Sequence, residues 1–261
     1  MTFAVGISNS RLATAKRGVA VELAAQLAKV ADAPVCLVGA DPTDRDVERH
    51  LPRMTEAWGR PARMEITRGT HHVEVSNFIG AGVCAISLSD RESVELVFPI
   101  LAARFPFLIV DAPSRTGFGV GIADVLLARL DALLVATGLT AGELSETRSY
   151  VERLESRAGA QRVERRVLPV GDASESGLAL EQLEWRLALL PALGPVPRLG
   201  GGVGPQASLE PAAIDAAFKP VVRWIIDQQA RATSRGVPVG AMSVDASPKR
   251  HVANRFYREH D

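Results

Sequence analysis

Four charged side chains could together handle a phosphate group. Lys16 and Arg17 follow a short apolar run at 3–7 and stand at the start of a stretch with helical spacing. Asp41 and Asp111 each follow another apolar run of strand type. The N-terminus of a helix attracts phosphate oxygens through its N–H groups and its dipole. The strand, loop and helix around Lys16 and Arg17 are therefore laid out like a phosphate-binding unit.

Each of these residues also has a simpler explanation. Lys16 on the first turn of a helix can point into solvent, as surface lysines do. Asp41 precedes Pro42, which fits a turn equally well. Asp111 at a strand end can cap the turn that follows it. The sequence thus leaves both a binding role and a structural role open for all three.

The elements that must position these residues alternate along the chain. Apolar runs that are nearly continuous in Val, Ile, Leu and Ala are typical of strands covered on both faces. We predict strands at 3–7, 35–38, 83–87, 107–110, 132–136, 166–170 and 195–198, and helices at 13–30, 91–104, 121–129, 142–157, 177–189 and 208–229. This alternation implies an α/β fold with a doubly wound, mostly parallel sheet flanked by helices. Residues 43–80 are more polar and are predicted to form an irregular excursion, with His71 and His72 in a surface loop.

The length and the charge balance favour a single globular domain and argue against nucleic-acid-binding and membrane-spanning proteins. The 261 residues suit one α/β domain, which we place at 1–230, followed by a flexible polar tail at 231–261. Phe256 and Tyr257 lie among basic residues, so a docking peptide is the alternative for this tail. Thirty acidic and thirty basic residues balance, which argues against a nucleic-acid partner. No apolar run is long enough to span a membrane, and we expect a cytoplasmic protein. Cys36 and Cys84 lie in apolar runs and are predicted to pack as small hydrophobes.

Over roughly residues 2–225, the chain resembles the MinD/ParA group of P-loop ATPases. The family's loop reads Lys-Gly-Gly-Val-Gly-Lys-Thr-Thr and precedes a helix with Leu-Ala-Ala-x-Leu-Ala, which stands here at 23–28. Counting back from this helix places Arg-Leu-Ala-Thr-Ala-Lys-Arg-Gly, residues 11–18, on the loop. A rival register that aligns 16–19 with Lys-Gly-Gly-Val leaves no second lysine. The resemblance implies that the nucleotide-binding residues are Arg11, Ala15, Lys16, Arg17, Gly18 and Asp111.

The resemblance also assigns individual roles. Lys16 takes the position of the phosphate-binding lysine, and Arg11 that of the signature lysine that reaches the partner's nucleotide across a dimer. Asp111, in Phe-Leu-Ile-Val-Asp-Ala-Pro, takes the Walker B position beside Mg²⁺, which it holds through water. Asp41 matches the switch aspartate associated with the attacking water. Asp172 stands where family members usually read the base with an asparagine.

Several positions depart from the family pattern. Leu12, Ala13 and Ala15 replace three glycines, whose positive φ angles let backbone N–H groups surround a phosphate. Arg17 replaces the threonine whose hydroxyl holds Mg²⁺, and a guanidinium has no lone pair for a metal. These departures predict weak or absent ATP hydrolysis, while an anion at the helix start stays compatible with the sequence.

Members of this family position other components in the cell. Because the scaffold of this chain is whole while its loop residues are altered, it fits best a subgroup resembling the CpaE/TadZ proteins of pilus and secretion systems. The resemblance implies a dimeric organiser or assembly factor that binds a protein of a localisation or secretion machinery. ATP or ADP, with Mg²⁺, is the implied cofactor, and the altered loop leaves open that none binds. Three alternatives remain: an active ParA-type partitioning ATPase that binds DNA, a small-molecule ligase or kinase of the superfamily, and an interaction module with a vestigial loop. Arg17 argues against the ligase or kinase.

Overall fold

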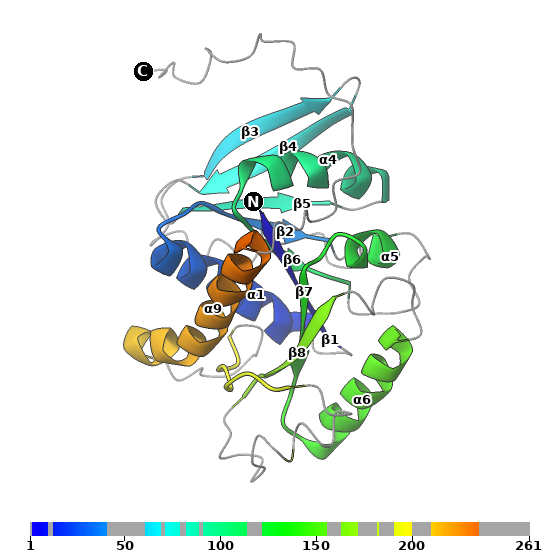
Figure 1. Ribbon diagram of the computed structural model, residues 1–261, viewed down its shortest axis with the longest axis vertical. Helices are drawn as coiled ribbons and strands as arrows, with labels where there is room; N and C mark the ends of the chain where they lie inside the picture. The colour runs from blue at the N-terminus through cyan, green and yellow to red at the C-terminus, as the bar shows by residue number, and fades with distance from the viewer. Residues whose placement is uncertain are drawn as a thin grey trace.

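The computed structural model consists of one mixed sheet between two layers of helices (Figure 1). It describes residues 2–9, 13–40, 61–68, 71–78, 82–88, 91–113, 122–155, 163–171, 182, 191–199 and 210–234, with only the backbone at 13–15, 61–68 and 71–78. The strands are β1 (Phe3–Asn9), β2 (Val35–Gly39), β3 (Pro61–Arg68), β4 (His71–Phe78), β5 (Val83–Ser87), β6 (Phe107–Asp111), β7 (Ala132–Thr137) and β8 (Glu164–Pro169). The helices are α1 (Ala13–Ala31), α4 (Arg91–Arg104), α5 (Ile122–Leu127), α6 (Ala141–Glu155) and α9 (Pro211–Ser234).

The strand order is β3-β4-β5-β2-β6-β1-β7-β8, and the strands from β5 to β8 pair in parallel. This confirms the predicted doubly wound parallel sheet and six of the predicted strands. The predicted strand at 195–198 is wrong in its extent, since that segment joins β8 only through the bridge between Val170 and Val196. The predicted helix at 177–189 lies outside the described residues except at residue 182, and so does the tail from residue 235.

The irregular excursion predicted beside the second strand is also wrong in part. Residues 61–78 contain an antiparallel hairpin of β3 and β4, and β4 extends the sheet by pairing antiparallel with β5. His71 and His72 begin β4, opposite Arg68 and Thr67, and do not form a loop. The hairpin gives the parallel sheet a two-stranded antiparallel edge, seen above β5 in Figure 1.

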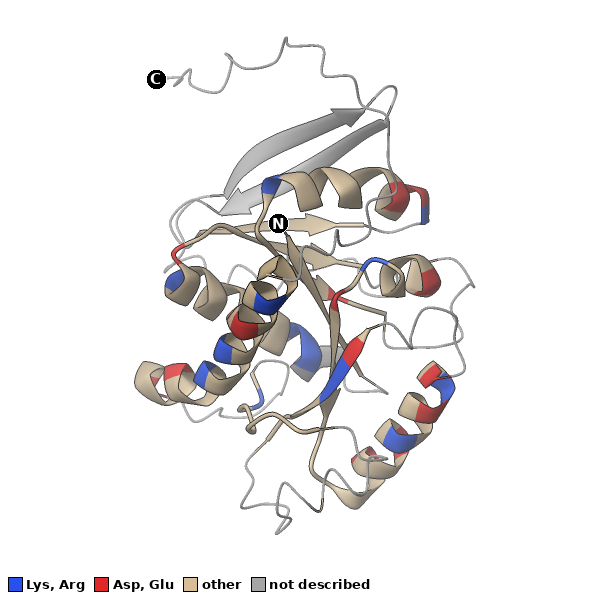
Figure 2. Cartoon of the chain, in the orientation of Figure 1, with Lys and Arg blue, Asp and Glu red and all other residues tan. Residues whose placement is uncertain are grey.

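The helices cover the sheet on both faces. α1 and α9 pack against each other on one face, over Val5, Ile7 and Ile109. α4, α5 and α6 cover the other face, over alternate residues such as Leu108 and Val110. Acidic and basic residues are interspersed along α6 and α9, while the central strands are mostly uncharged (Figure 2). None of the described helices is long and apolar enough to cross a membrane.

The two cysteines lie in the second of these cores. Cys36 and Cys84 are register partners on β2 and β5, and both are free and buried. Burial raises the pKa of the Cys36 thiol, and a hydrogen bond with that thiol lowers the pKa of Cys84. The prediction that both residues pack as small hydrophobes is confirmed.

β1 and β6 are parallel neighbours, and the connections that follow them leave towards opposite faces of the sheet. β1 leads into α1 on one face of the sheet, and β6 leads towards α5 on the opposite face. In open α/β sheets, ligands bind outside the carboxyl ends of strands at such a switch point, because the two following loops part there. The fold therefore places Asn9 and Asp111, the last residues of β1 and β6, at this edge.

Asp131, just before β7, should make the stability of the protein depend on pH. Its Oδ2 accepts a hydrogen bond of 2.7 Å from the Ala4 N–H. Burial raises the pKa of Asp131 from 3.8 to about 6, against the opposing effect of that bond. Folding therefore favours the protonated acid, so its contribution to stability is complete below pH 3.8 and is lost as the pH rises through about 6.

We expect Asp131→Asn to raise the free energy of unfolding at neutral pH by on the order of 2 kcal/mol, because its amide oxygen can still accept the Ala4 bond. Urea unfolding of both proteins near pH 4 and about pH 8 measures this, and the gain should vanish at the acidic end. Asp227→Asn removes the same charge from an exposed position on α9 and serves as the control. An equal gain at both pH values would contradict the prediction.

Candidate functional site

Two cations at the start of α1 meet one carboxylate at the end of β6. The Nζ atom of Lys16 lies 2.8 Å from Oδ1 of Asp111, and the Nε atom of Arg17 lies 3.6 Å from Oδ2. Lys16 also donates a hydrogen bond of 2.5 Å to the carbonyl oxygen of Ala112. The side chains of Lys16, Arg17 and Asp111 are all at most 2% exposed. The sequence thus predicted residues that do come together, in a buried ionic cluster.

The sheet register explains why Asp111 faces these cations. Phe107 and Ile109 lie in the core under α1, and Asp111 continues the same alternation on β6. Its register partner on β1 is Ile7, which lies in that core too. Because a buried carboxylate is costly unless it is paired, the apolar surroundings favour close cations. Lys16 and Arg17 supply them from the adjacent helix.

The start of α1 differs from a loop that encircles a phosphate. α1 begins at Ala13, so Ala13, Thr14 and Ala15 are already helical. Among the described residues, Asp32 is the one non-glycine residue with positive φ. Ala15 therefore occupies a helical turn, without the backbone reversal that glycine permits in phosphate loops. What the helix start keeps is the partial positive charge of a helix N-terminus.

Gly18 contacts another part of the chain. A Cβ atom at Gly18 would lie 2.0 Å from the carbonyl oxygen of Leu199 and 2.7 Å from its carbonyl carbon. The segment 191–199 thus passes directly over α1 at this position. Gly18 is required for the close approach of these two backbones, a role that the sequence pattern alone does not indicate.

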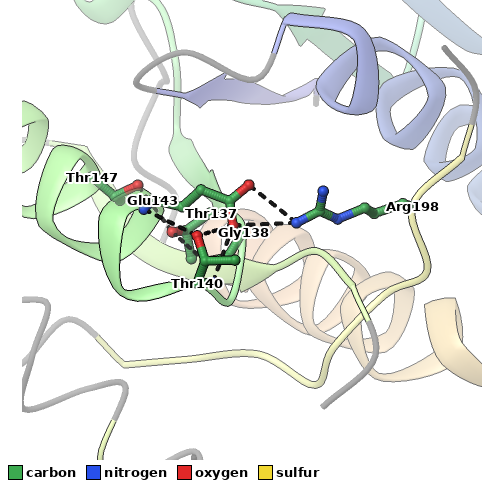
Figure 3. Close-up of polar contacts among 6 residues, drawn as sticks. All are labelled: Thr137, Gly138, Thr140, Glu143, Thr147 and Arg198. Carbon is green, nitrogen blue, oxygen red and sulfur yellow. Dashed lines mark hydrogen bonds and ion pairs between the residues drawn. The ribbon is translucent and has the colours of Figure 1, made fainter. Parts of the chain in front are cut away.

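The same segment, 191–199, ties α1 to β8 and α6. Its Ala192 bridges Val167 of β8, its Val196 bridges Val170 directly after β8, and its Arg198 contacts α6 (Figure 3). The Nη2 atom of Arg198 lies 3.1 Å and 3.2 Å from the two carboxylate oxygens of Glu143. The segment therefore spans from the start of α6 to the second turn of α1.

Glu143 also holds the first turn of α6 as a capping box with Thr140. The backbone N–H and the hydroxyl of Thr140 both donate to Glu143 Oε2, at 3.1 Å and 2.8 Å. Burial would raise the pKa of Glu143, but these bonds and the Arg198 guanidinium together lower it. The Thr-x-x-Glu pattern could have identified this cap in the sequence. Its partner Arg198 could not be identified there, because the pair is 55 residues apart.

Two further polar residues at this edge were not singled out by sequence. Asn9 is 1% exposed, and neither its Oδ1 nor its Nδ2 has a hydrogen-bond partner among the described residues. The hydroxyl of Ser8, on the opposite face, is also buried without one in the described part of the chain. It lines a cavity of about 20 Å³ with Ala112, Leu126 and Tyr150, which has room for one or two water molecules.

Other predicted residues are not placed by the structure. Arg11, Asp41 and Asp172 lie outside the described residues. Their assignments as dimer-reaching cation, switch aspartate and base reader stay predictions.

The cluster does not fit a divalent metal. Mg²⁺ requires oxygen ligands, but Arg17 offers none at the position where the family has a hydroxyl. Asp111, the carboxylate to which the resemblance assigns the metal, already contacts two cations. No group of three or more His, Cys, Asp and Glu side chains in the described part of the chain could hold a metal ion.

No model of a protein family matches the chain, and no curated protein matches its sequence. Solved structures do match it. A ParA family ATPase from Chlorobium tepidum aligns with a TM-score of 0.61 at 14% identity, over 87% of this chain and 99% of its own. Cobyrinic acid a,c-diamide synthase from Mycobacterium smegmatis aligns at 0.58 and 14%, over 92% and 99%. The septum site-determining protein MinD of Pyrococcus horikoshii, complexed with Mg-ADP, aligns at 0.54 and 15%, over 89% and 96%. These likenesses show the MinD/ParA P-loop fold.

Proposed function

We propose that the chain is a degenerate MinD/ParA-like protein that acts as a dimeric spatial organiser or assembly scaffold, with weak or no ATP hydrolysis. The observation that carries this proposal is the buried contact between Lys16 and Asp111. The lysine that the resemblance assigns to a phosphate is engaged with the protein's own carboxylate and with the Ala112 carbonyl.

Binding of a nucleotide would have to compete with these contacts. Separating a buried ion pair leaves charges in a poorly solvating interior, which costs several kcal/mol unless new partners replace the old ones. Loss of the glycine-dependent backbone reversal at Ala15 removes N–H groups that would offset this cost. Hydrolysis would further lack the metal ligand replaced by Arg17. The parts of the site thus favour a stable scaffold over rapid turnover.

A scaffold needs a surface, and we propose that α6 contributes to it. α6 exposes residues of both charges, and the pair of Arg198 and Glu143 connects it to the segment over α1. A protein of a cell-division, pilus or secretion machinery is the kind of partner that the resemblance implies. A homodimer is the assembly it implies.

The experiment is a measurement of turnover and mass on the same sample. Purified protein is assayed for ATP hydrolysis and for binding of ATP and ADP by calorimetry, with and without Mg²⁺, while light scattering gives the mass. A dimer whose turnover does not exceed that of a Lys16→Met variant supports the proposal. Robust Mg²⁺-dependent turnover that disappears in Asp41→Ala refutes the lack of hydrolysis, and a monomer under all conditions refutes the dimeric organiser.

A further inference from the structure

We propose that Asp111 acts as a built-in anion that occupies an oxyanion site, so that the site is autoinhibited and works without a divalent metal. Lys16 and Arg17 are the cations of this site, and the ligand class is a tetrahedral oxyanion, free or as part of a nucleotide. The inference deepens the proposed function and rests on the same closed site, but it has its own readout.

Two cations of α1 converge on one carboxylate. Lys16 and Arg17 leave the first turns of one helix and converge on the two oxygens of a single carboxylate, at 2.8 Å and 3.6 Å. Ammonium and guanidinium groups at a helix start are the donors that proteins use for phosphate. Here the Asp111 carboxylate accepts these two cations, and like a phosphate it presents two anionic oxygens to them. Asp111 therefore stands where an oxyanion would be attracted.

The side-chain amide of Asn9 is buried without a hydrogen-bond partner among the described residues. Asn9 ends β1 two residues after Ile7, the register partner of Asp111, and so lies on the same face and at the same edge of the sheet. A buried amide without partners among the described residues costs free energy that a ligand would recover. Its Nδ2 can donate to an oxyanion, so the face and edge of the sheet that carry Asp111 also carry a third donor group.

Arg17 stands where a metal ligand is expected. In the family that the sequence resembles, the aspartate at the position of Asp111 holds Mg²⁺ through water, and a hydroxyl at the position of Arg17 is a further ligand. Arg17 brings a permanent positive charge to this carboxylate in place of that cation. Binding of an oxyanion would thus depend on displacing Asp111 and would not depend on Mg²⁺.

The test is Asp111→Asn, which removes the competing charge and keeps the shape of the side chain. In EDTA, inorganic phosphate should bind this variant roughly tenfold or more tightly than the wild type, measured by calorimetry and by the phosphate-dependent rise in Tm. ADP is the second arm, and it shows whether a nucleotide supplies the oxyanion. Sodium chloride at matched ionic strength corrects for the general effect of salt.

Asp131→Asn is the control, because it removes the charge of a half-buried aspartate at the opposite end of the parallel strands, before β7. It should respond to phosphate as the wild type does. The double variant Lys16→Met with Asp111→Asn lacks one of the cations and should lose most of the gained affinity. If Asp111→Asn does not fold in chloride, phosphate should restore its folding, and failure to do so overturns the proposal.

Two other results also overturn it. One is a folded Asp111→Asn protein that binds phosphate and ADP no better than the wild type. The other is Mg²⁺-dependent binding of ADP to the wild type that Asp111→Asn abolishes, since Asp111 would then be a metal ligand. A monomeric protein without turnover, by contrast, would refute the dimeric scaffold but would not contradict the occupation of the oxyanion site by Asp111.

Discussion

Gly18→Ala should destabilise the protein by about 1–3 kcal/mol and lower its Tm by several degrees, because the new methyl group meets a backbone that cannot move independently. The carbonyl oxygen of Leu199 would lie 2.0 Å from the added Cβ. Leu199 follows a segment held to β8 by backbone hydrogen bonds such as that from Val196 N–H to the Pro169 carbonyl. To make room for the added carbon, either α1 or this whole segment must shift. Thermal and urea unfolding measure the loss.

Gly142→Ala is the matched control for this substitution. Gly142 is also helical, in the first turn of α6, and a Cβ there would meet nothing within 4 Å. Alanine is the better helix former, so this variant should gain roughly 0.5–1 kcal/mol. The two variants therefore differ in sign, although the chemical change is the same. A Gly18→Ala protein that is as stable as the wild type would show that segment 191–199 does not press on α1.

Lys16→Met should cost about 3 kcal/mol of folding stability, because it leaves Asp111 buried with one of its two cations removed. Methionine matches the four-atom stem of lysine and keeps its apolar contacts, so the loss reports mainly the ammonium group. At this chain size the expected fall in Tm is roughly 6–12 °C. The variant should show this loss in the absence of any nucleotide.

Lys29→Met is the control, because Lys29 is in the same helix and also pairs with an aspartate. Its Nζ lies 2.6 Å from Asp215 Oδ2, but the lysine side chain is 65% exposed. Solvent screens an exposed pair and leaves it a small contribution, so Lys29→Met should change stability little. If the two variants lose the same small amount, Lys16 is not part of the structural cluster, and its role would be confined to ligand binding.

The parallel core could be predicted from the sequence because its signal is local. Strands covered on both faces need continuous apolar runs, and 35–38, 107–110 and 132–136 have them. The helix at 91–104 was predicted with both of its ends, since its apolar residues recur at helical spacing. The hairpin at 61–78 was missed because the strand predictions relied on continuous apolar runs. The alternation of Met64 and Ile66 with polar residues is a weaker signal, typical of a strand covered on one face.

The site could be predicted only in part. Lys16 and Asp111 could be expected at one edge of the sheet, because parallel strands and the helix after β1 meet there. Their direct contact could not, since the resemblance places a ligand between such residues. The approach of Leu199 to Gly18 and of Arg198 to Glu143 depends on tertiary packing over long separations in the chain, and no local pattern specifies it.

The path of segment 191–199 has a thermodynamic consequence. One end of it contacts α1 two residues after Lys16, and the Arg198 side chain contacts the first turn of α6. If a ligand that shifts the start of α1 displaces this segment and so changes how α6 binds a protein, that protein must change the affinity of the ligand by the same factor. Such reciprocity requires no turnover. A protein of this architecture can report the occupancy of its interior to its surroundings by equilibrium binding alone.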